Sequence, residues 1–162
     1  MNTRELIGHM RAVREAYDAL SRGDRAVLRR CRNEEELVLD GIYWQIAGHA
    51  DREAQRCLPC IVLCYPAAKQ LKNPARFRLG TMFRRSLHPG AKVVRAGDAI
   101  RFRQLLAARD RSELAHRLRR LLKQAGVPVD WGTIGCDVHY WGANVRRRWA
   151  QDFYAPDTEE EQ

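Results

Sequence analysis

Apolar residues in this chain recur at the spacing of an α-helix almost from end to end, and this periodicity limits the fold more than any other feature. Within Arg4–Leu20, for example, Val13, Tyr17 and Leu20 lie three or four residues apart. No run alternates apolar and polar residues for the length that would seed a sheet. The sequence therefore predicts an all-α fold.

Breaks in this periodicity divide the chain into about eight predicted helices arranged as a two-lobed bundle. Pro and Gly gather in residues 88–97, which we interpret as a linker between an N-terminal helical lobe, 1–88, and a basic helical lobe, 97–154. Residues 155–162 are an acidic tail that we expect to be disordered. The predicted helices are Arg4–Leu20, Arg25–Arg32, Glu34–Ala47, Glu53–Leu71, Ala75–Leu87, Ile100–Ala108, Ser112–Gln124 and a last stretch that Asp130 can cap and that runs to about Phe153.

Positive charge is concentrated in the second part of the chain. The net charge of the 162 residues is +9, and residues 61–154 carry 19 basic side chains against six acidic ones, whereas residues 1–60 are neutral. Arg outnumbers Lys 25 to 4, and Arg suits bidentate contacts with phosphate, although a GC-rich genome would also raise the arginine content. This balance favours a polyanionic partner, either nucleic acid or an anionic membrane.

The sequence gives no sign of a membrane segment. No apolar run approaches the roughly 18 residues that a membrane helix needs, and residues 1–10 lack the apolar core of a signal peptide. We therefore expect a cytoplasmic protein whose five cysteines are reduced thiols.

Two of the predicted helices, Ser112–Gln124 and the last stretch after Asp130, each carry an apolar stripe that is separate from their basic residues. An ordinary soluble helix also has a polar face, but that face mixes charges of both signs, whereas acidic residues are almost absent from the basic faces of these two helices. We therefore predict a surface that contacts a polyanion. The basic residues outside the two apolar stripes include His116, Arg119, Arg120, Lys123, Arg146 and Arg147.

Three cysteines, Cys57, Cys60 and Cys64, share one face of the apolar segment that Pro59 and Pro66 are expected to bend or interrupt. A Cys-x-x-Cys pair can bind zinc or an iron–sulfur cluster, but no clear fourth ligand lies nearby, so packing in the core is the favoured interpretation. A metal-dependent enzyme built on these cysteines stays an alternative. No phosphate loop and no nucleophile with its base is visible, so we expect no catalytic residue, metal or cofactor.

The four tryptophans raise the question of base stacking. Trp141 and Trp149 fall on an apolar stripe and are expected in the core. Trp131, directly after the predicted cap, is the tryptophan for which stacking on a base stays open.

Several short motifs follow one another in the C-terminal half, and as a set they are fairly specific. They are Arg101-Phe102-Arg103-Gln104-Leu105-Leu106, Leu118-Arg119-Arg120-Leu121-Leu122, Val129-Asp130-Trp131, Tyr140-Trp141-Gly142, Arg146-Arg147-Arg148-Trp149 and Asp152-Phe153-Tyr154. This series resembles the CasB family, the small subunit of the type I-E CRISPR surveillance complex Cascade. The N-terminal half agrees more loosely, and the resemblance covers the chain apart from the acidic tail.

The resemblance implies a non-catalytic, all-helical subunit of a ribonucleoprotein that acts in antiviral defence. Its implied partners are the CRISPR RNA, both strands of the target DNA, the large and backbone subunits of Cascade, and a second copy packed head to tail. It implies nucleic-acid contact by Arg30, Arg101, Arg111 and Arg120. The helical wheels add Arg119, Lys123, Arg146 and Arg147, and Arg109 is added as the neighbour of the turn at Arg111.

Contacts of this kind bind the sugar-phosphate backbone, so they stabilise an R-loop without recognising particular bases. A DNA-binding regulator of the helix-turn-helix type is the second hypothesis. Such a regulator would prefer particular base sequences, which backbone contacts alone do not provide.

Overall fold

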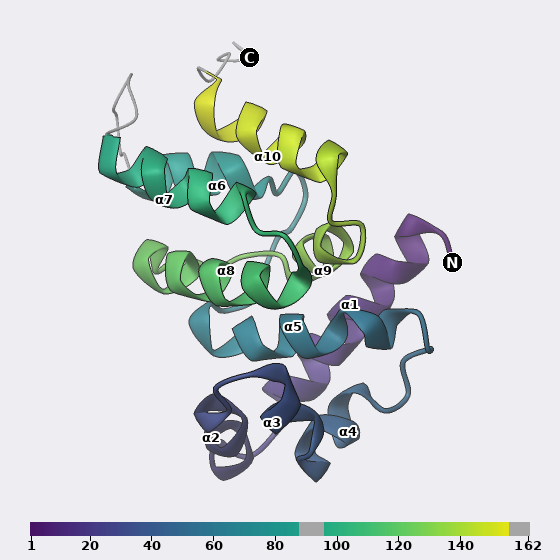
Figure 1. Cartoon of the computed structure of the whole chain (residues 1–162). Coiled ribbons are helices and arrows are strands. Elements are labelled where there is room, and N and C mark those ends of the chain that lie inside the picture. The colour runs from purple at the N-terminus through teal and green to yellow at the C-terminus, as the bar shows by residue number, and fades with distance from the viewer. Residues whose placement is uncertain (88–95, 156–162) are drawn as a thin grey trace.

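The computed structural model describes residues 1–87 and 96–155, and helices build all of its layers (Figure 1). Within these ranges there are ten α-helices, two short 3-10 helices and no strand beyond an isolated bridge between Gln70 and Val129. The predicted all-α helical bundle is confirmed. The elements are α1 (Thr3–Asp18), α2 (Arg22–Arg30), α3 (Glu34–Val38), α4 (Gly41–Ala47), η1 (Ala54–Arg56), α5 (Leu58–Cys64), η2 (Tyr65–Ala67), α6 (Leu79–Leu87), α7 (Ala96–Leu106), α8 (Arg111–Ala125), α9 (Trp131–His139) and α10 (Ala143–Tyr154).

The described ranges hold more helices than the expected eight because two predicted helices are each divided. The helix predicted over Glu34–Ala47 breaks where the Asp40 side chain accepts a hydrogen bond from the Ile42 amide, 2.9 Å away, and so starts α4. The stretch from Asp130 to Phe153 breaks at Tyr140–Gly142, where the backbone leaves the helical region.

Proline fixes the limits of the apolar segment in the middle of the chain. Pro59 lies in the first turn of α5, where its missing N–H is not needed, and Pro66 lies in η2. The predicted interruption by these prolines is confirmed. Helix α6 begins at Leu79 instead of Ala75, because Arg76 adopts a left-handed conformation with φ of 64°.

Helices that are far apart in the sequence pack against each other around one hydrophobic core. Helix α1 crosses α9, α5 lies against α8, and α6 lies against α10. Two of these contacts depend on glycine. A Cβ atom at Gly135 would lie 2.6 Å from Cγ of Met10, and one at Gly80 would lie 2.4 Å from the carbonyl oxygen of Trp149.

The N-terminus of α9 is held by Asp130, whose side chain is fully buried. It accepts hydrogen bonds from the amides of Gly132 and Thr133 at 3.3 and 3.2 Å, which confirms the predicted cap. Arg11 on α1 donates to it at 3.0 Å, and the Gln70 side chain donates at 3.1 Å. Burial alone would raise the pKa of Asp130, but the hydrogen bonds outweigh it, so its pKa lies below the usual value.

The predicted linker at 88–97 lies mostly outside the described residues, and so does the acidic tail after residue 155. The division into lobes at 1–88 and 97–154 therefore stays a prediction. Helices from both sides of the linker share the core, since α1 packs on α9 and α6 on α10. No helix in the described part of the chain has both the length and the apolar character needed to cross a membrane.

Candidate nucleic-acid interface

Helix α8 is the element around which the predicted basic residues are arranged. Its N-terminus is capped by Asp110, whose side chain accepts from the Glu113 amide at 2.8 Å, and it ends at Gly126 in a left-handed conformation. Its buried leucines face α5 and α7. The helix is therefore fixed at both ends and along its apolar face, and it exposes polar residues along two edges.

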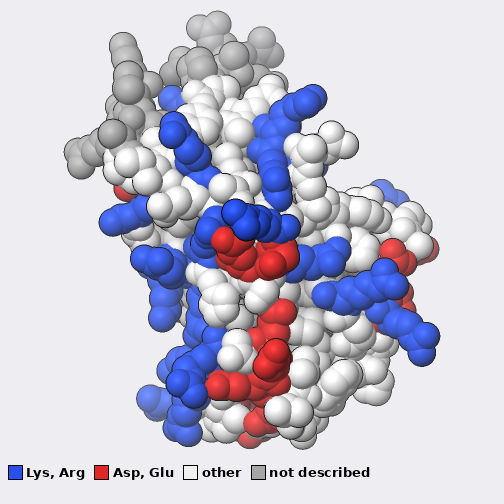
Figure 2. All heavy atoms as spheres, in the orientation of Figure 1, with Lys and Arg blue, Asp and Glu red and all other residues white. Residues whose placement is uncertain are grey.

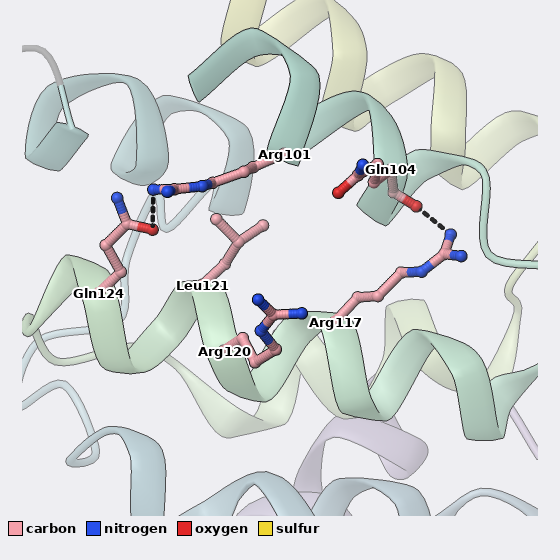
Figure 3. A pocket seen from close by; sticks show the side chains of 6 residues that line it. All are labelled: Arg101, Gln104, Arg117, Arg120, Leu121 and Gln124. Carbon is pink, nitrogen blue, oxygen red and sulfur yellow. Dashed lines mark hydrogen bonds between the residues drawn. The ribbon is translucent and has the colours of Figure 1, made fainter. Parts of the chain in front are cut away.

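One edge of α8 forms a groove with α7, which we call the α7–α8 groove (Figure 3). The groove encloses about 210 Å³. Its lining is polar apart from one leucine and carries three arginines. The lining residues are Arg101 and Gln104 from α7, and Arg117, Arg120, Leu121 and Gln124 from α8.

The three guanidinium groups of the groove differ in their partners. Arg101 donates to the side-chain oxygen of Gln124 at 3.1 Å, and Arg117 is bound by the Glu113 carboxylate and the main-chain oxygen of Gln104. Arg120 is exposed and extends between them, with no hydrogen bond or ion pair to another described residue. Three positive charges with one carboxylate nearby give this groove a net positive charge, which favours an anionic ligand.

The other edge of α8 faces α2. Arg119 donates to the carbonyl oxygens of Arg29 and Cys31 at 3.3 and 3.5 Å, at the C-terminus of α2. Arg30 and Lys123 are exposed. Figure 2 shows the face of the molecule that is seen in Figure 1. Basic side chains gather along its left edge, from α2 past α8 to α7, while the acidic side chains lie mainly toward its centre.

A second group of predicted residues meets where the α7–α8 turn lies beside the α9–α10 turn. Arg111 donates to the carbonyl oxygens of Val138 and His139 at 3.3 and 2.9 Å. Arg146 donates to the Ala108 carbonyl at 2.6 Å, and its guanidinium lies 5.2 Å from the centroid of the Trp141 ring. Arg109 and Arg147 are exposed nearby in the chain.

The structure thus divides the nine predicted contact residues into two kinds. Three of them, Arg111, Arg119 and Arg146, are partly buried and hydrogen-bonded to carbonyl groups near helix ends, so each also joins two elements. The other six are exposed: Arg30, Arg101, Arg109, Arg120, Lys123 and Arg147. Contact of all nine with nucleic acid stays a prediction.

Arg117 is a residue of the groove that the sequence did not predict. It is three residues before Arg120 and seven before Gln124, so all three fall on the edge of α8 that turns toward α7. The helical wheel of α8 contains this spacing, but it places the Arg117 side chain between the apolar stripe and the outer face. Only the position of α7 makes that edge part of a groove.

The other candidate sites from the sequence are buried. Cys57, Cys60 and Cys64 have no more than 2% of their surface exposed, which confirms the core interpretation. Burial raises the pKa of Cys57 and Cys64 to about 12. No cluster of three or more His, Cys, Asp and Glu side chains in the described ranges is arranged to hold a metal ion.

Trp131 is also unavailable for stacking on a base. It is fully buried, its indole N–H donates to the Ala68 carbonyl at 3.2 Å, and its ring packs edge-on against Tyr65. Trp149 is buried and Trp141 partly buried, as expected.

Comparison with known proteins gives the family of this chain. No curated protein matches it. The chain is similar in fold to a chain in the crystal structure of E. coli Cascade bound to a PAM-containing dsDNA target, with 24% identity, a TM-score of 0.72, and coverage of 89% of this chain and 93% of that chain. The family model for the CRISPR-associated protein Cse2 matches residues 24–154. This match extends over most of the chain and confirms the resemblance to the small-subunit family, so the chain belongs to the CRISPR-associated protein Cse2 family.

Proposed function

We propose that this chain is a non-catalytic small subunit of a type I-E Cascade ribonucleoprotein, and that it stabilises the R-loop by binding nucleic-acid backbones. Membership of the Cse2 family and the similarity in fold to a chain of E. coli Cascade support the assignment to Cascade. The proposed ligands are the hybrid of CRISPR RNA and target DNA, and the displaced strand. The proposed protein partners are the large and backbone subunits and a second copy of this chain, packed head to tail.

The observation that carries the nucleic-acid assignment is the state of Arg120 in the α7–α8 groove. The exposed guanidinium of Arg120, which has no hydrogen bond or ion pair to a described residue, lies between two others that hydrogen bonds hold in place. Arg101 and Arg117 lose little side-chain entropy when an anion binds, because their positions are already restricted. Arg120 is free to donate two parallel hydrogen bonds to one phosphate group.

Backbone contacts of this kind suit the energetics of an R-loop. The RNA–DNA hybrid is about as stable as the DNA duplex that it replaces, so the exchange is nearly balanced. A protein that binds the phosphates of the opened strands stabilises the open state whatever its base sequence. The other exposed basic residues, Arg30, Arg109, Lys123 and Arg147, extend the surface available for these contacts.

The test compares the double variant Arg101→Ala/Arg120→Ala with the wild-type chain in binding to single strands and RNA–DNA hybrids between 50 and 200 mM salt. If one or both of these arginines neutralise a phosphate, the slope of log K against log salt falls in magnitude by roughly 0.7 to 1.4 on single strands. The matched control is Arg4→Ala/Arg52→Ala, which removes the same charge from exposed positions elsewhere. Two unrelated base sequences should respond equally.

Equal slopes of log K against log salt for the groove variant and the control variant would show that the groove is not part of the interface. A wild-type chain that binds neither ligand in dilute buffer overturns the whole proposal. A strong preference for one base sequence would instead support the helix-turn-helix hypothesis.

A further inference from the structure

Three aromatic side chains are strongly exposed in the described residues, and they differ in their surroundings. Trp44 is 48% exposed, Tyr140 49% and Tyr154 43%. Trp44 donates its indole N–H to the carbonyl of Val38, the last residue of the acidic helix α3. Tyr154 packs edge-on against Phe102 in the core. The arginine that donates to the carbonyl groups on both sides of Tyr154, Arg84, is buried. The two arginines at the turn that holds Tyr140, Arg111 and Arg146, are only partly buried.

Tyr140 sits directly after α9, and its position is fixed on one side. Its ring meets the ring of His139 edge to face, with 4.7 Å between the centroids and an interplanar angle of 88°. His139 is itself almost buried, with Nδ1 3.7 Å from Sγ of Cys57 and Nε2 3.4 Å from a carboxylate oxygen of Glu53. A ring that is braced in this way loses little freedom when a second flat group packs against it.

Guanidinium groups lie on two sides of the same turn. Arg111 donates at 2.9 Å to the carbonyl of His139, the residue just before Tyr140. Arg146 lies over Trp141, the residue just after it. Both arginines are only partly buried, so a phosphate group can approach them from solvent.

We infer that Tyr140 stacks on an unpaired nucleobase of a single strand whose backbone phosphate is bound by Arg111 or Arg146. This inference rests on the proposed function and adds to it a preference for single strands. An aromatic platform beside a cationic track is the usual arrangement for binding a single strand without regard to sequence, because every base has a π-face. A base inside a duplex is already stacked on both faces, so Tyr140 favours single strands.

The position of Tyr140 complements that of the α7–α8 groove. Arg111 and Arg120 are nine residues apart on α8, which is about 14 Å along the helix axis. This is the axial length of roughly four stacked nucleotides. An oligonucleotide of twelve residues is therefore long enough to reach both places.

The experiment measures binding of the full chain to a twelve-residue oligothymidylate and to an abasic oligomer of the same length. Tyr140→Ala should weaken binding to the oligothymidylate roughly 5- to 150-fold and leave binding to the abasic oligomer unchanged. Tyr140→Phe should retain the affinity. Tyr140→Leu, which keeps apolar bulk at the turn without an aromatic ring, should lose affinity as Tyr140→Ala does and keeps the test informative if the alanine variant folds poorly.

Tyr154→Ala is the matched control, because it removes a similarly exposed tyrosine from another surface. Unchanged binding of Tyr140→Leu to oligothymidylate would overturn the inference, and so would an equal loss on both oligomers. In either case a wild-type chain that binds both oligomers leaves the proposed function standing. A wild-type chain that binds neither oligomer at low salt overturns the proposed function and this inference together.

Discussion

Replacing Asp130 by Ala tests how the fold holds α9 in place. The buried Asp130 carboxylate accepts hydrogen bonds from the first turn of α9, from Arg11 on α1 and from Gln70 in the segment between η2 and α6. It also accepts from the hydroxyl of Thr133 at 2.6 Å. Alanine would leave these donors without an acceptor at a place where α1 and α9 are packed together.

The expected loss in the free energy of unfolding follows from these contacts. An N-cap contributes about 1 kcal/mol. The charge-assisted bond to Arg11 belongs at the lower end of about 1.5–3 kcal/mol, because the Arg11 side chain is 42% exposed and water can solvate it when the carboxylate is gone. Gln70 and Thr133 each lose an acceptor, which costs about 1 kcal/mol apiece. Asp130→Ala should therefore lose about 4 kcal/mol.

Urea unfolding followed by far-UV circular dichroism measures this change, provided that the slope of free energy against urea is the same for both proteins. Asp130→Asn keeps one acceptor oxygen and should lose about 2 kcal/mol. Glu36→Ala is the control, since its ion pair with Arg32 is exposed to solvent and should contribute less than about 1 kcal/mol. A loss for Asp130→Ala no larger than that of the control would refute the reasoning.

The same carboxylate predicts a dependence on pH. The pKa of Asp130 is lowered in the folded chain, so the unfolded chain binds its proton more readily as the pH falls. The stability that Asp130 contributes is complete above its unfolded pKa, about 3.9, and is lost as the pH falls through its folded pKa. The difference in stability between the wild type and Asp130→Asn should therefore be constant near neutral pH and shrink below about pH 4.

Two further predictions concern the core. Gly80→Ala should cost about 3 kcal/mol, because the new Cβ would meet the main-chain oxygen of Trp149, whereas Gly97→Ala, with open space around its Cβ, should be neutral in the same thermal unfolding assay; equal melting temperatures would show that α6 and α10 are not packed this closely. Burial raises the pKa of Cys57 to about 12, so it should stay unreactive toward a thiol reagent at pH 8 while the partly exposed Cys31 reacts; rapid modification of Cys57 in the native chain would contradict the burial that the structure shows.

Local sequence patterns account for the helices and for much of the candidate interface. Helical spacing of apolar residues predicts α1 and α8 to within a few residues, and Asp130 marks the start of α9. These features depend on side chains that lie within one or two turns of each other, so the printed sequence contains them. The breaks at Asp40 and at Tyr140–Gly142 were missed, because apolar periodicity continues across both of them.

A helical wheel gives the direction of a side chain around its own axis but not the neighbour that it meets. The wheels indicate Arg119, Arg120 and Arg146 as basic residues on or beside polar faces. Only the packing of α2 and of the α7–α8 turn shows that Arg119 and Arg146 donate to carbonyl groups there. The same packing leaves Arg120 without a partner within residues 1–87 and 96–155. The same packing brings Arg117 into the groove and buries Trp131.

The helical character of the chain, the places of most of its helices and the basic character of its later part can all be predicted from the sequence, because each depends on composition or on near neighbours along the chain. Tertiary packing settles which of the chain's guanidinium groups donate to main-chain oxygens of other helices and turns. Arg111 donates to His139, which is 28 positions away in the sequence, and Arg119 donates to Arg29, which is 90 positions away. Such contacts form only when the helices have packed.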